Sequence, residues 1–177
     1  ILIDLGMPLL DESGKELDSN SLKSLPIHEL VKRRVLPDIP GLYDTDGSNP
    51  IDGILLSHAH QDHYGLFGYS RQDTKFFMSK PTEVLIDLTN TFGKPSNRLG
   101  DIHTFRTSES FTIGDFRVTP YLMDHSAFDA HAFLFEIEGK RVFYSGDFRG
   151  HGRKERAYQW FLHNAPQYID ALLMEGT

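Results

Sequence analysis

Four residues of one short segment, His58, His60, Asp62 and His63, carry side chains that bind transition metals. Their spacing, His-x-His-x-Asp-His, places the first two imidazoles at alternate positions, and on an extended loop such side chains point the same way. His58 and His60 can therefore reach one ion, while Asp62 and His63 turn toward a neighbouring ion. We expect two metal sites from this single turn of the chain.

The available ligand types narrow both the metal and the reaction. The chain has nine histidines and no cysteine, which excludes disulfides and thiolate ligands. Imidazoles and carboxylates suit Zn²⁺, Mn²⁺ or Fe²⁺. Two such ions about 3.5 to 4 Å apart can share a hydroxide and stabilise both oxygens of a displacement. The segment therefore predicts a two-metal-ion hydrolase; the competing interpretation is a polar loop whose histidines cap a helix and meet solvent.

The elements around this segment predict a strand-to-helix loop. Apolar residues 51–56 have the pattern of a buried strand that runs directly into the histidines. Most of the chain before Pro50 is turn-rich, with a weak helical period over residues 27–35. Residues 76–78 predict another strand, followed by a helix with Pro81 in its first turn. The apolar face of that helix is predicted to hold Val84, Leu85 and Leu88.

The second half of the chain predicts antiparallel hairpins. Residues 111–113 and 116–118 flank one turn, and residues 132–137 and 142–144 flank another. A helix over residues 153–163, with Tyr158, Phe161 and Leu162 facing inward, leads to a strand over residues 169–174. We therefore expect an α/β class with α+β layers, in one domain over residues 1–177.

With His-x-His-x-Asp-His following a strand, the sequence resembles the metallo-β-lactamase superfamily, and further motifs of that family occur in order. Asp4 matches a carboxylate that lies beneath the metals, His125 matches a metal-ligand histidine, and Asp147 matches the carboxylate that bridges both ions. The resemblance implies an αββα sandwich, of which this chain would be the N-terminal portion, and catalytic roles for Asp62 and Asp147. The implied metal ligands are His58, His60, Asp62, His63, His125 and Asp147.

Residues 145–149, Ser-Gly-Asp-Phe-Arg, and residues 174–177, Met-Glu-Gly-Thr, are similar to the β-CASP branch, which includes RNase J. This resemblance implies that a metal-bound hydroxide cleaves RNA, with two divalent ions, Zn²⁺ or alternatively Mn²⁺. Glu175 would assist proton transfer at the leaving group, and Ser126 would contact phosphate. The last metal-ligand histidine of the family has no counterpart after His163. We therefore expect the N-terminal part of a catalytic domain, inactive as a nuclease by itself.

Two other functions remain open from the sequence. A hydrolase of a small ester or thioester, similar to glyoxalase II or a lactonase, would share the ligands and lack the context around Glu175. A non-catalytic homologue would keep a metal site without turnover. His131 is the first residue of an apolar strand. We expect its side chain to be packed in the core or exposed to solvent, in preference to lining the metal site. The basic cluster over residues 149–156 could contact an RNA backbone, but its simplest interpretation is a helix face exposed to solvent.

Charge and hydropathy limit the partners. The net charge of -7 argues against a simple nucleic-acid-binding module, although two divalent cations would add about +4 within one cleft. No apolar run approaches the roughly 18 to 20 residues that cross a bilayer, and residues 1–6 lack the basic start of a signal peptide. We expect a cytoplasmic protein with RNA as substrate and no membrane contact. The sequence leaves homo-oligomer formation open.

Overall fold

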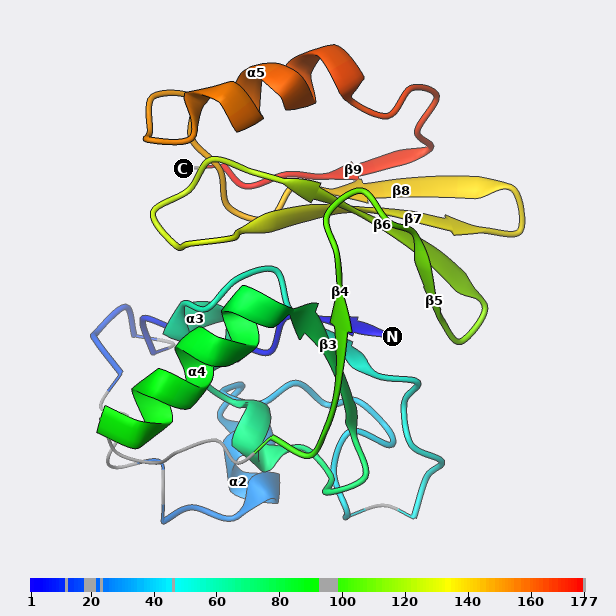
Figure 1. The fold of residues 1–177 in the computed structure, drawn as a ribbon. Helices are drawn as coiled ribbons and strands as arrows, with labels where there is room; N and C mark the ends of the chain where they lie inside the picture. The colour runs from blue at the N-terminus through cyan, green and yellow to red at the C-terminus, as the bar shows by residue number, and fades with distance from the viewer. Residues whose placement is uncertain (12, 18–21, 23, 46, 93–98, 177) are drawn as a thin grey trace.

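The computed structural model describes residues 1–11, 13–17, 22, 24–45, 47–92 and 99–176. Its strands form two sheets that face each other, and helices cover the outer surface of each sheet (Figure 1). This arrangement confirms the expected α/β class and the αββα order of layers. Among the described helices, none combines the length and the apolar character that a bilayer crossing requires.

The first sheet is parallel, with the strand order β1-β2-β3-β4. Its strands are β1 (Leu2–Ile3), β2 (Ile54–Leu55), β3 (Lys75–Ser79) and β4 (Asp101–Phe105). The connections contain α2 (Ile27–Lys32), α3 (Gln61–Tyr64), the 3-10 turn η1 (Phe67–Tyr69) and α4 (Lys80–Phe92). Parallel strands end at a common edge, so Asp4 after β1 and His58 after β2 are brought together.

The second sheet has the order β5-β6-β7-β8-β9. Its strands are β5 (Phe111–Ile113), β6 (Phe116–Leu122), β7 (His131–Ile137), β8 (Lys140–Tyr144) and β9 (Ala171–Leu173). Both predicted hairpins are present. Glu138 (φ 49°) and Gly139 (φ 73°) supply the two positive φ angles of a two-residue type I′ turn. Helix α5 (Glu155–Asn164) then leads back to β9, which pairs parallel to β8.

Three apolar clusters fill the spaces between the layers. In β2, Ile54 belongs to the cluster under α2, α3 and α4, whereas Leu55 belongs to the cluster between the sheets. Both side chains are fully buried, as expected for a central parallel strand. The third cluster lies between the second sheet and α5, where Phe161 packs against Phe143. The segment that carries His58, His60 and His63 therefore follows a strand whose two faces are both packed.

The predicted apolar face of α4 is wrong. The buried side chains of this helix are Thr82 and Ile86, whereas Val84 and Leu88 are 44% and 47% exposed. The reason is the direct junction with β3: Ser79 Oγ donates to Thr82 Oγ1 at 3.0 Å, and this contact turns the Thr82 side toward the sheet. Leu85, the third predicted residue, is only partly buried.

Helix α5 and strand β4 also differ from the sequence-based expectation. Phe161 stacks on Phe143, with 5.5 Å between ring centroids, whereas Leu162 is 52% exposed. Consecutive helical residues point in directions about 100° apart, so only one of this pair can face the sheet. Strand β4 was not predicted because its sequence is mostly polar: Asp101, His103 and Thr104 are exposed.

Gly6 lies where the loop after β1 meets the metal-binding segment. Leu5 N donates to His63 O at 2.8 Å, and a Cβ on Gly6 would lie 1.5 Å from Asp62 O. We expect Gly6→Ala to lower the free energy of unfolding by about 2 to 3 kcal/mol, because backbone atoms on both sides must separate. Urea unfolding measures this change. Gly176→Ala, with open space around it, should stay within about 0.5 kcal/mol; a similarly small loss for Gly6→Ala would contradict the prediction.

Candidate metal centre

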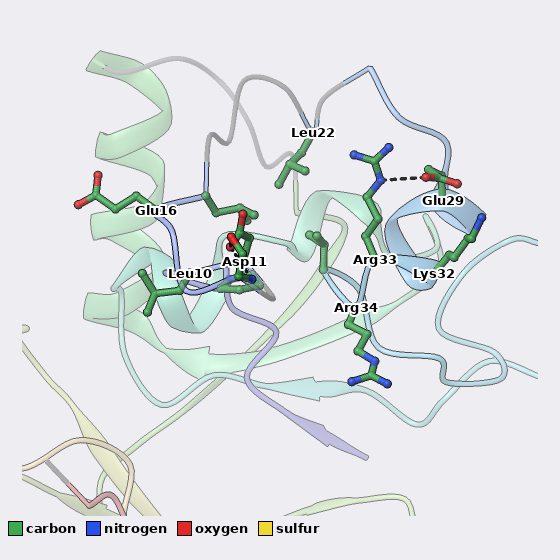
Figure 2. Close-up of a pocket in the computed structure, with 12 residues that line it drawn as sticks. Leu10, Asp11, Glu16, Leu22, Glu29, Lys32, Arg33 and Arg34 are labelled. Carbon is green, nitrogen blue, oxygen red and sulfur yellow. Dashed lines mark hydrogen bonds and ion pairs between the residues drawn. The ribbon is translucent and has the colours of Figure 1, made fainter.

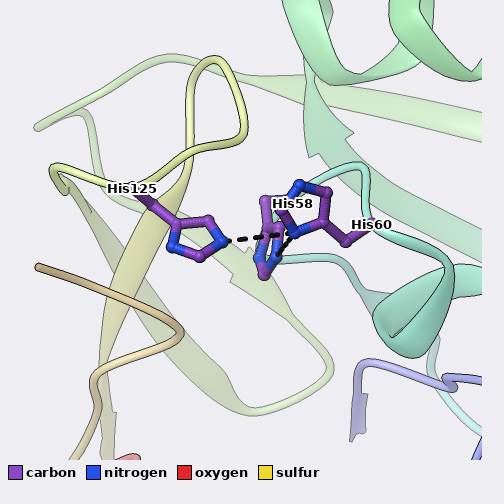
Figure 3. Close-up of side chains that lie close together, drawn as sticks. All are labelled: His58, His60 and His125. Carbon is purple, nitrogen blue, oxygen red and sulfur yellow. Dashed lines mark hydrogen bonds between the residues drawn. The ribbon is translucent and has the colours of Figure 1, made fainter. Parts of the chain in front are cut away.

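Three histidine nitrogens converge at the carboxyl edge of the first sheet. His58 follows β2, His60 is the N-cap residue of α3, and His125 follows β6 of the opposite sheet. His60 Nδ1 lies 3.1 Å from His58 Nε2 and 3.2 Å from His125 Nε2, and the three rings point toward one another (Figure 3). Residues far apart in the sequence thus form one cluster of imidazoles.

The spacing of these nitrogens fits a metal ion. Zn²⁺–N distances of about 2.0 to 2.1 Å place neighbouring nitrogens of a tetrahedral site about 3.3 to 3.4 Å apart. The nitrogens of His58, His60 and His125 all lie within 4.8 Å of one another, and the two closest pairs are near the tetrahedral value. Neutral imidazole nitrogens that face one another in this way can share an ion through their lone pairs. The donor set therefore suits Zn²⁺ or a similar divalent ion.

A second group adjoins the first and consists of His58, His63 and Asp147. Asp147 Oδ1 lies 3.5 Å from His63 Nε2, whereas its Oδ2 lies 3.9 Å from His58 Nε2 and 3.8 Å from His125 Nε2. One oxygen of the carboxylate thus faces each group. This is the position that a carboxylate bridging two cations requires.

Asp62 is the predicted ligand that stands apart from these groups. Its Oδ2 is 4.0 Å from His63 Nε2, and the part of the chain that the structure describes places it in neither group. The other five predicted ligands, His58, His60, His63, His125 and Asp147, all belong to one group or both. Their positions are compatible with two ions, and their assignment as ligands stays a prediction.

The electrostatics of the centre favour an added cation. Burial, reinforced by the charges of neighbouring histidines, lowers the pKa of His58 to about 2, so its imidazole is neutral. Burial opposes protonation of His63 too, but hydrogen bonds to Asp147 and Asp4 outweigh it and raise the pKa to about 10. In the metal-free protein, a proton therefore supplies the positive charge between two carboxylates. The hydrogen bond from His63 is also the main reason for the lowered pKa of Asp147.

Asp4 lies on the opposite side of His63 from Asp147. Its Oδ2 accepts a hydrogen bond from His63 Nδ1 at 2.8 Å, which leaves Nε2 to face Asp147. Ser57 N donates to Asp4 Oδ1 at 2.8 Å, and Asp4 itself has a left-handed backbone with φ 54°. Asp4 thus lies behind the two ligand groups, and its role beneath the metals stays a prediction.

Glu175 and Ser126 lie beside the same centre. Glu175 Oε1 accepts a hydrogen bond from Phe148 N at 2.5 Å, next to Asp147 in the chain. Asp147 and Glu175 both line a cavity of about 400 Å³. Ser126 Oγ is exposed and 3.5 Å from His125 Nε2. Both residues thus lie next to proposed ligands, and their roles in proton transfer and phosphate contact stay predictions.

Asp124 is a residue of this region that the sequence reasoning missed. Its side chain is fully buried, and its Oδ2 and Oδ1 accept hydrogen bonds from Gly152 N at 2.7 Å and Lys154 N at 3.2 Å. Its carbonyl accepts a further bond from Arg149 N at 2.7 Å. Asp124 therefore fastens the loop that follows Asp147 to the loop that carries His125. The available signal was a charged residue set directly between an apolar strand and a candidate ligand.

His131 has the packed role that was expected in preference to a site role. The side chain is 1% exposed, its Nε2 is 2.8 Å from Thr107 Oγ1, and its ring meets Phe105 edge-on. Burial lowers the pKa of His131, so the ring is neutral. Its backbone N donates to Ser57 O at 3.1 Å, and this bond joins β7 to the start of the metal-binding segment.

A larger cavity of about 740 Å³ lies away from the histidines, between the N-terminal loop and α2 (Figure 2). Leu10, Leu17 and Leu22 line it, and three of its charged groups, Arg33, Glu29 and Asp11, have partners close by. Arg33 Nε pairs with Glu29 Oε1 at 2.8 Å, and Asp11 Oδ1 accepts from Ser13 and Lys15. This cavity holds neither of the metal-binding groups, so we assign the chemistry to the histidine cluster.

Comparison with known proteins gives one family. The family model for the beta-lactamase superfamily domain matches residues 26–176. Endoribonuclease YSH1 of Gibberella zeae is 30% identical over 76% of this chain and 19% of its own length. Cleavage and polyadenylation specificity factor subunit 3 of Dictyostelium discoideum is 26% identical over 97% of this chain and 23% of its own. Ribonuclease J of Sinorhizobium meliloti is 25% identical over 65% of this chain and 20% of its own length. The chain thus spans about a fifth of these relatives.

A solved structure supports the fold. A protein of unknown function from Enterococcus faecalis V583 superposes with a TM-score of 0.77 at 23% identity, covering 99% of this chain and 44% of the other. Nearly all of the present chain therefore shares one arrangement of strands and helices with that protein. At this level of identity the likeness describes the fold alone.

Proposed function

This chain belongs to the beta-lactamase superfamily, where its relatives are ribonucleases of the β-CASP and RNase J type, and we propose that it is a metal-dependent phosphodiesterase that cleaves RNA. The observation that carries the proposal is the position of Asp147, with one carboxylate oxygen facing each of two adjoining ligand groups. A centre built for two cations suits the hydrolysis of a phosphodiester, whose transition state carries charge on several oxygens.

The proposed site residues divide into those that would bind the metal ions and those that would act on the substrate. In this proposal His58, His60 and His125 hold one ion, and His63 with Asp62 holds the second. Asp147 sets the spacing of the two. Divalent ions bound there, Zn²⁺ or Mn²⁺, would supply Lewis acidity and positive charge. His63 keeps its Nε2 free for this purpose because its Nδ1 bonds to Asp4 at 2.8 Å.

Glu175 and Ser126 act on the substrate in this proposal. Ser126, exposed beside His125, donates a hydrogen bond to a phosphate oxygen and so fixes the scissile group. Glu175 assists proton transfer to the departing 3′-oxygen, from a position on the same cavity as Asp147. The negative net charge of the chain leaves these local contacts, rather than a general basic surface, to position RNA. A cytoplasmic location remains part of the proposal.

Cleavage of RNA with a matched ester control tests this function. Residues 1–177, and in parallel the longest natural chain that contains them, are loaded with Zn²⁺ or Mn²⁺ and incubated with a 5′-labelled RNA or a small thioester. We expect RNA cleavage in at least one of the two proteins, with loss of activity after chelation and in His60→Ala. Thioester hydrolysis without RNA cleavage would replace the proposal by the small-ester alternative. Full metal loading with neither activity would support a non-catalytic homologue.

A further inference from the structure

Tyr144 is a half-buried tyrosine that meets the metal centre from behind. It ends β8 in the second sheet, and its hydroxyl donates to Asp4 Oδ2 at 2.7 Å across 140 residues of sequence. Asp4 follows β1 of the first sheet, so this bond joins the two sheets directly under the ligands. Burial, and then the charge of Asp4, raises the pKa of Tyr144 well above its ordinary range. The hydroxyl therefore stays protonated and remains a donor.

Asp4 connects this hydroxyl to one histidine of the second ligand group. Its Oδ2 accepts from Tyr144 and from His63 Nδ1, at 2.7 and 2.8 Å. When a metal displaces the second proton of the ring, a histidine that donates through Nδ1 presents Nε2 as its free nitrogen, and Nε2 is the atom that faces Asp147. The orientation of His63 thus depends on where the Asp4 carboxylate is held.

Ser57 extends the connection to the first ligand group. Its Oγ lies 2.9 Å from Asp4 Oδ2 and 3.0 Å from His58 Nδ1. A hydroxyl has one proton to give, so when Asp4 receives it, Ser57 Oγ is free to accept from His58 Nδ1. His58 then presents Nε2 toward His60, which is the arrangement in the structure. One carboxylate thus sets the tautomer of a histidine in each group.

We propose that Tyr144 is a positioning residue of the metal centre, which holds Asp4 and, through Ser57 and Asp4, fixes His58 and His63 in the tautomers that bind metal. The inference rests on the proposed metal centre and assigns a role that the ligand motifs do not contain. The Tyr144 hydroxyl bonds to Asp4, which is itself not one of the proposed ligands, so its effect on the metal is indirect. Outer hydrogen-bond partners of this kind change metal affinity by about 10-fold to 100-fold when removed.

The test measures metal affinity in the Tyr144→Phe protein. Phenylalanine keeps the ring and removes only the hydroxyl, so the packing of β8 is preserved. Zn²⁺ affinity is determined by competition with a chromophoric chelator, and we expect it to fall by about tenfold or more. The matched control is Tyr43→Phe, which removes a buried tyrosine hydroxyl that donates to Pro37 O at 2.9 Å. This control should bind Zn²⁺ within about twofold of the unsubstituted protein.

Two further measurements separate positioning from general stability. Thermal unfolding of the metal-free proteins should show a loss of stability for both Tyr144→Phe and Tyr43→Phe, because each loses one partly buried hydrogen bond, with the larger loss for Tyr144→Phe, whose acceptor is a carboxylate. Histidine ring ¹⁵N spectra should show altered Nδ1 signals for His63 in Tyr144→Phe only. Ser57→Ala should also weaken Zn²⁺ binding, and Ser57→Thr, which restores the hydroxyl, should recover it.

The outcomes distinguish this inference from the proposed function. If the unsubstituted protein fails to load Zn²⁺ or Mn²⁺, both the metal centre and the role of Tyr144 are wrong. If it loads metal and a folded Tyr144→Phe protein binds Zn²⁺ within about twofold of it, only the positioning role is overturned. If Tyr144→Phe fails to fold, the Ser57→Ala and Ser57→Thr pair decides: equal Zn²⁺ affinity in both contradicts the network.

Discussion

Replacing His58 by glutamine is expected to weaken Zn²⁺ binding at both ligand groups, so that at limiting free Zn²⁺ this protein retains less metal than a variant of a ligand confined to one group. Among the described residues, His58 is the one that belongs to both ligand groups, and its Nε2 lies 3.1 Å from His60 Nδ1 and 3.9 Å from Asp147 Oδ2. Structural Zn²⁺ sites bind with about 10 to 16 kcal/mol, which divides into roughly 2.5 to 4 kcal/mol for each of four ligands. A loss of that size lowers affinity about 10² to 10³-fold.

Two substitutions make the comparison specific. His63→Gln removes a ligand from the second group alone, so this protein should retain about one equivalent of metal. His28→Gln changes an exposed histidine of α2 that belongs to neither group, and its loading should match the unsubstituted protein. Metal content is measured by mass spectrometry on samples whose folding is checked by circular dichroism. At limiting free Zn²⁺, a metal content of folded His58→Gln equal to or above that of folded His63→Gln would show that His58 is no shared ligand.

The local part of the centre was predictable because one short segment encodes it. His58 and His60 occupy a loop between an apolar strand and the short helix that carries His63, and the ligand chemistry of all three is visible in their types and spacing. The parallel order of β1 and β2 then places Asp4 beside them. Strand ends gather on one edge wherever the strands lie parallel, so a β-α-β-α pattern carries this information.

The supporting residues could not be predicted in the same way, because tertiary contacts decide them. Tyr144 continues the apolar run of β8, and its sequence gives no sign that the hydroxyl reaches Asp4 in the other sheet. Asp124 has an equally ordinary place beside a strand, yet three backbone amides of the 149–154 loop converge on it. The face of α4 failed for the same reason: the contact of Ser79 with Thr82 sets the rotation of the helix. Periodicity alone cannot register such contacts.

The sequence also assigned the ligands to ions more rigidly than the structure does. Asp147 was expected in both sites, and its two oxygens do face the two groups. His58, however, lies within reach of both groups, whereas Asp62 lies in neither among the described residues. The two groups are therefore joined through a histidine as well as a carboxylate, which increases the dependence of each site on the other.

That coupling gives the bridging carboxylate its predicted effect on catalysis. Asp147→Asn keeps the shape of the side chain and removes its charge, so the mutual repulsion of two cations is no longer offset. We expect the rate of RNA cleavage to fall by a factor on the order of 10³, equivalent to about 4 kcal/mol of transition-state stabilisation. Binding of RNA should change much less, because the exposed contacts, including Ser126, are retained.

The measurement is single-turnover cleavage of a short 5′-labelled RNA at saturating Zn²⁺ or Mn²⁺, in whichever chain containing residues 1–177 shows activity. Saturating metal separates the role of Asp147 in the reaction from its role in holding the ions. Asp115→Asn, an exposed change in the turn between β5 and β6, is the matched control and should cleave at the unsubstituted rate. Thermal unfolding verifies that both variants are folded. A folded Asp147→Asn protein that cleaves within about threefold of the unsubstituted rate would exclude a bridging role for this carboxylate.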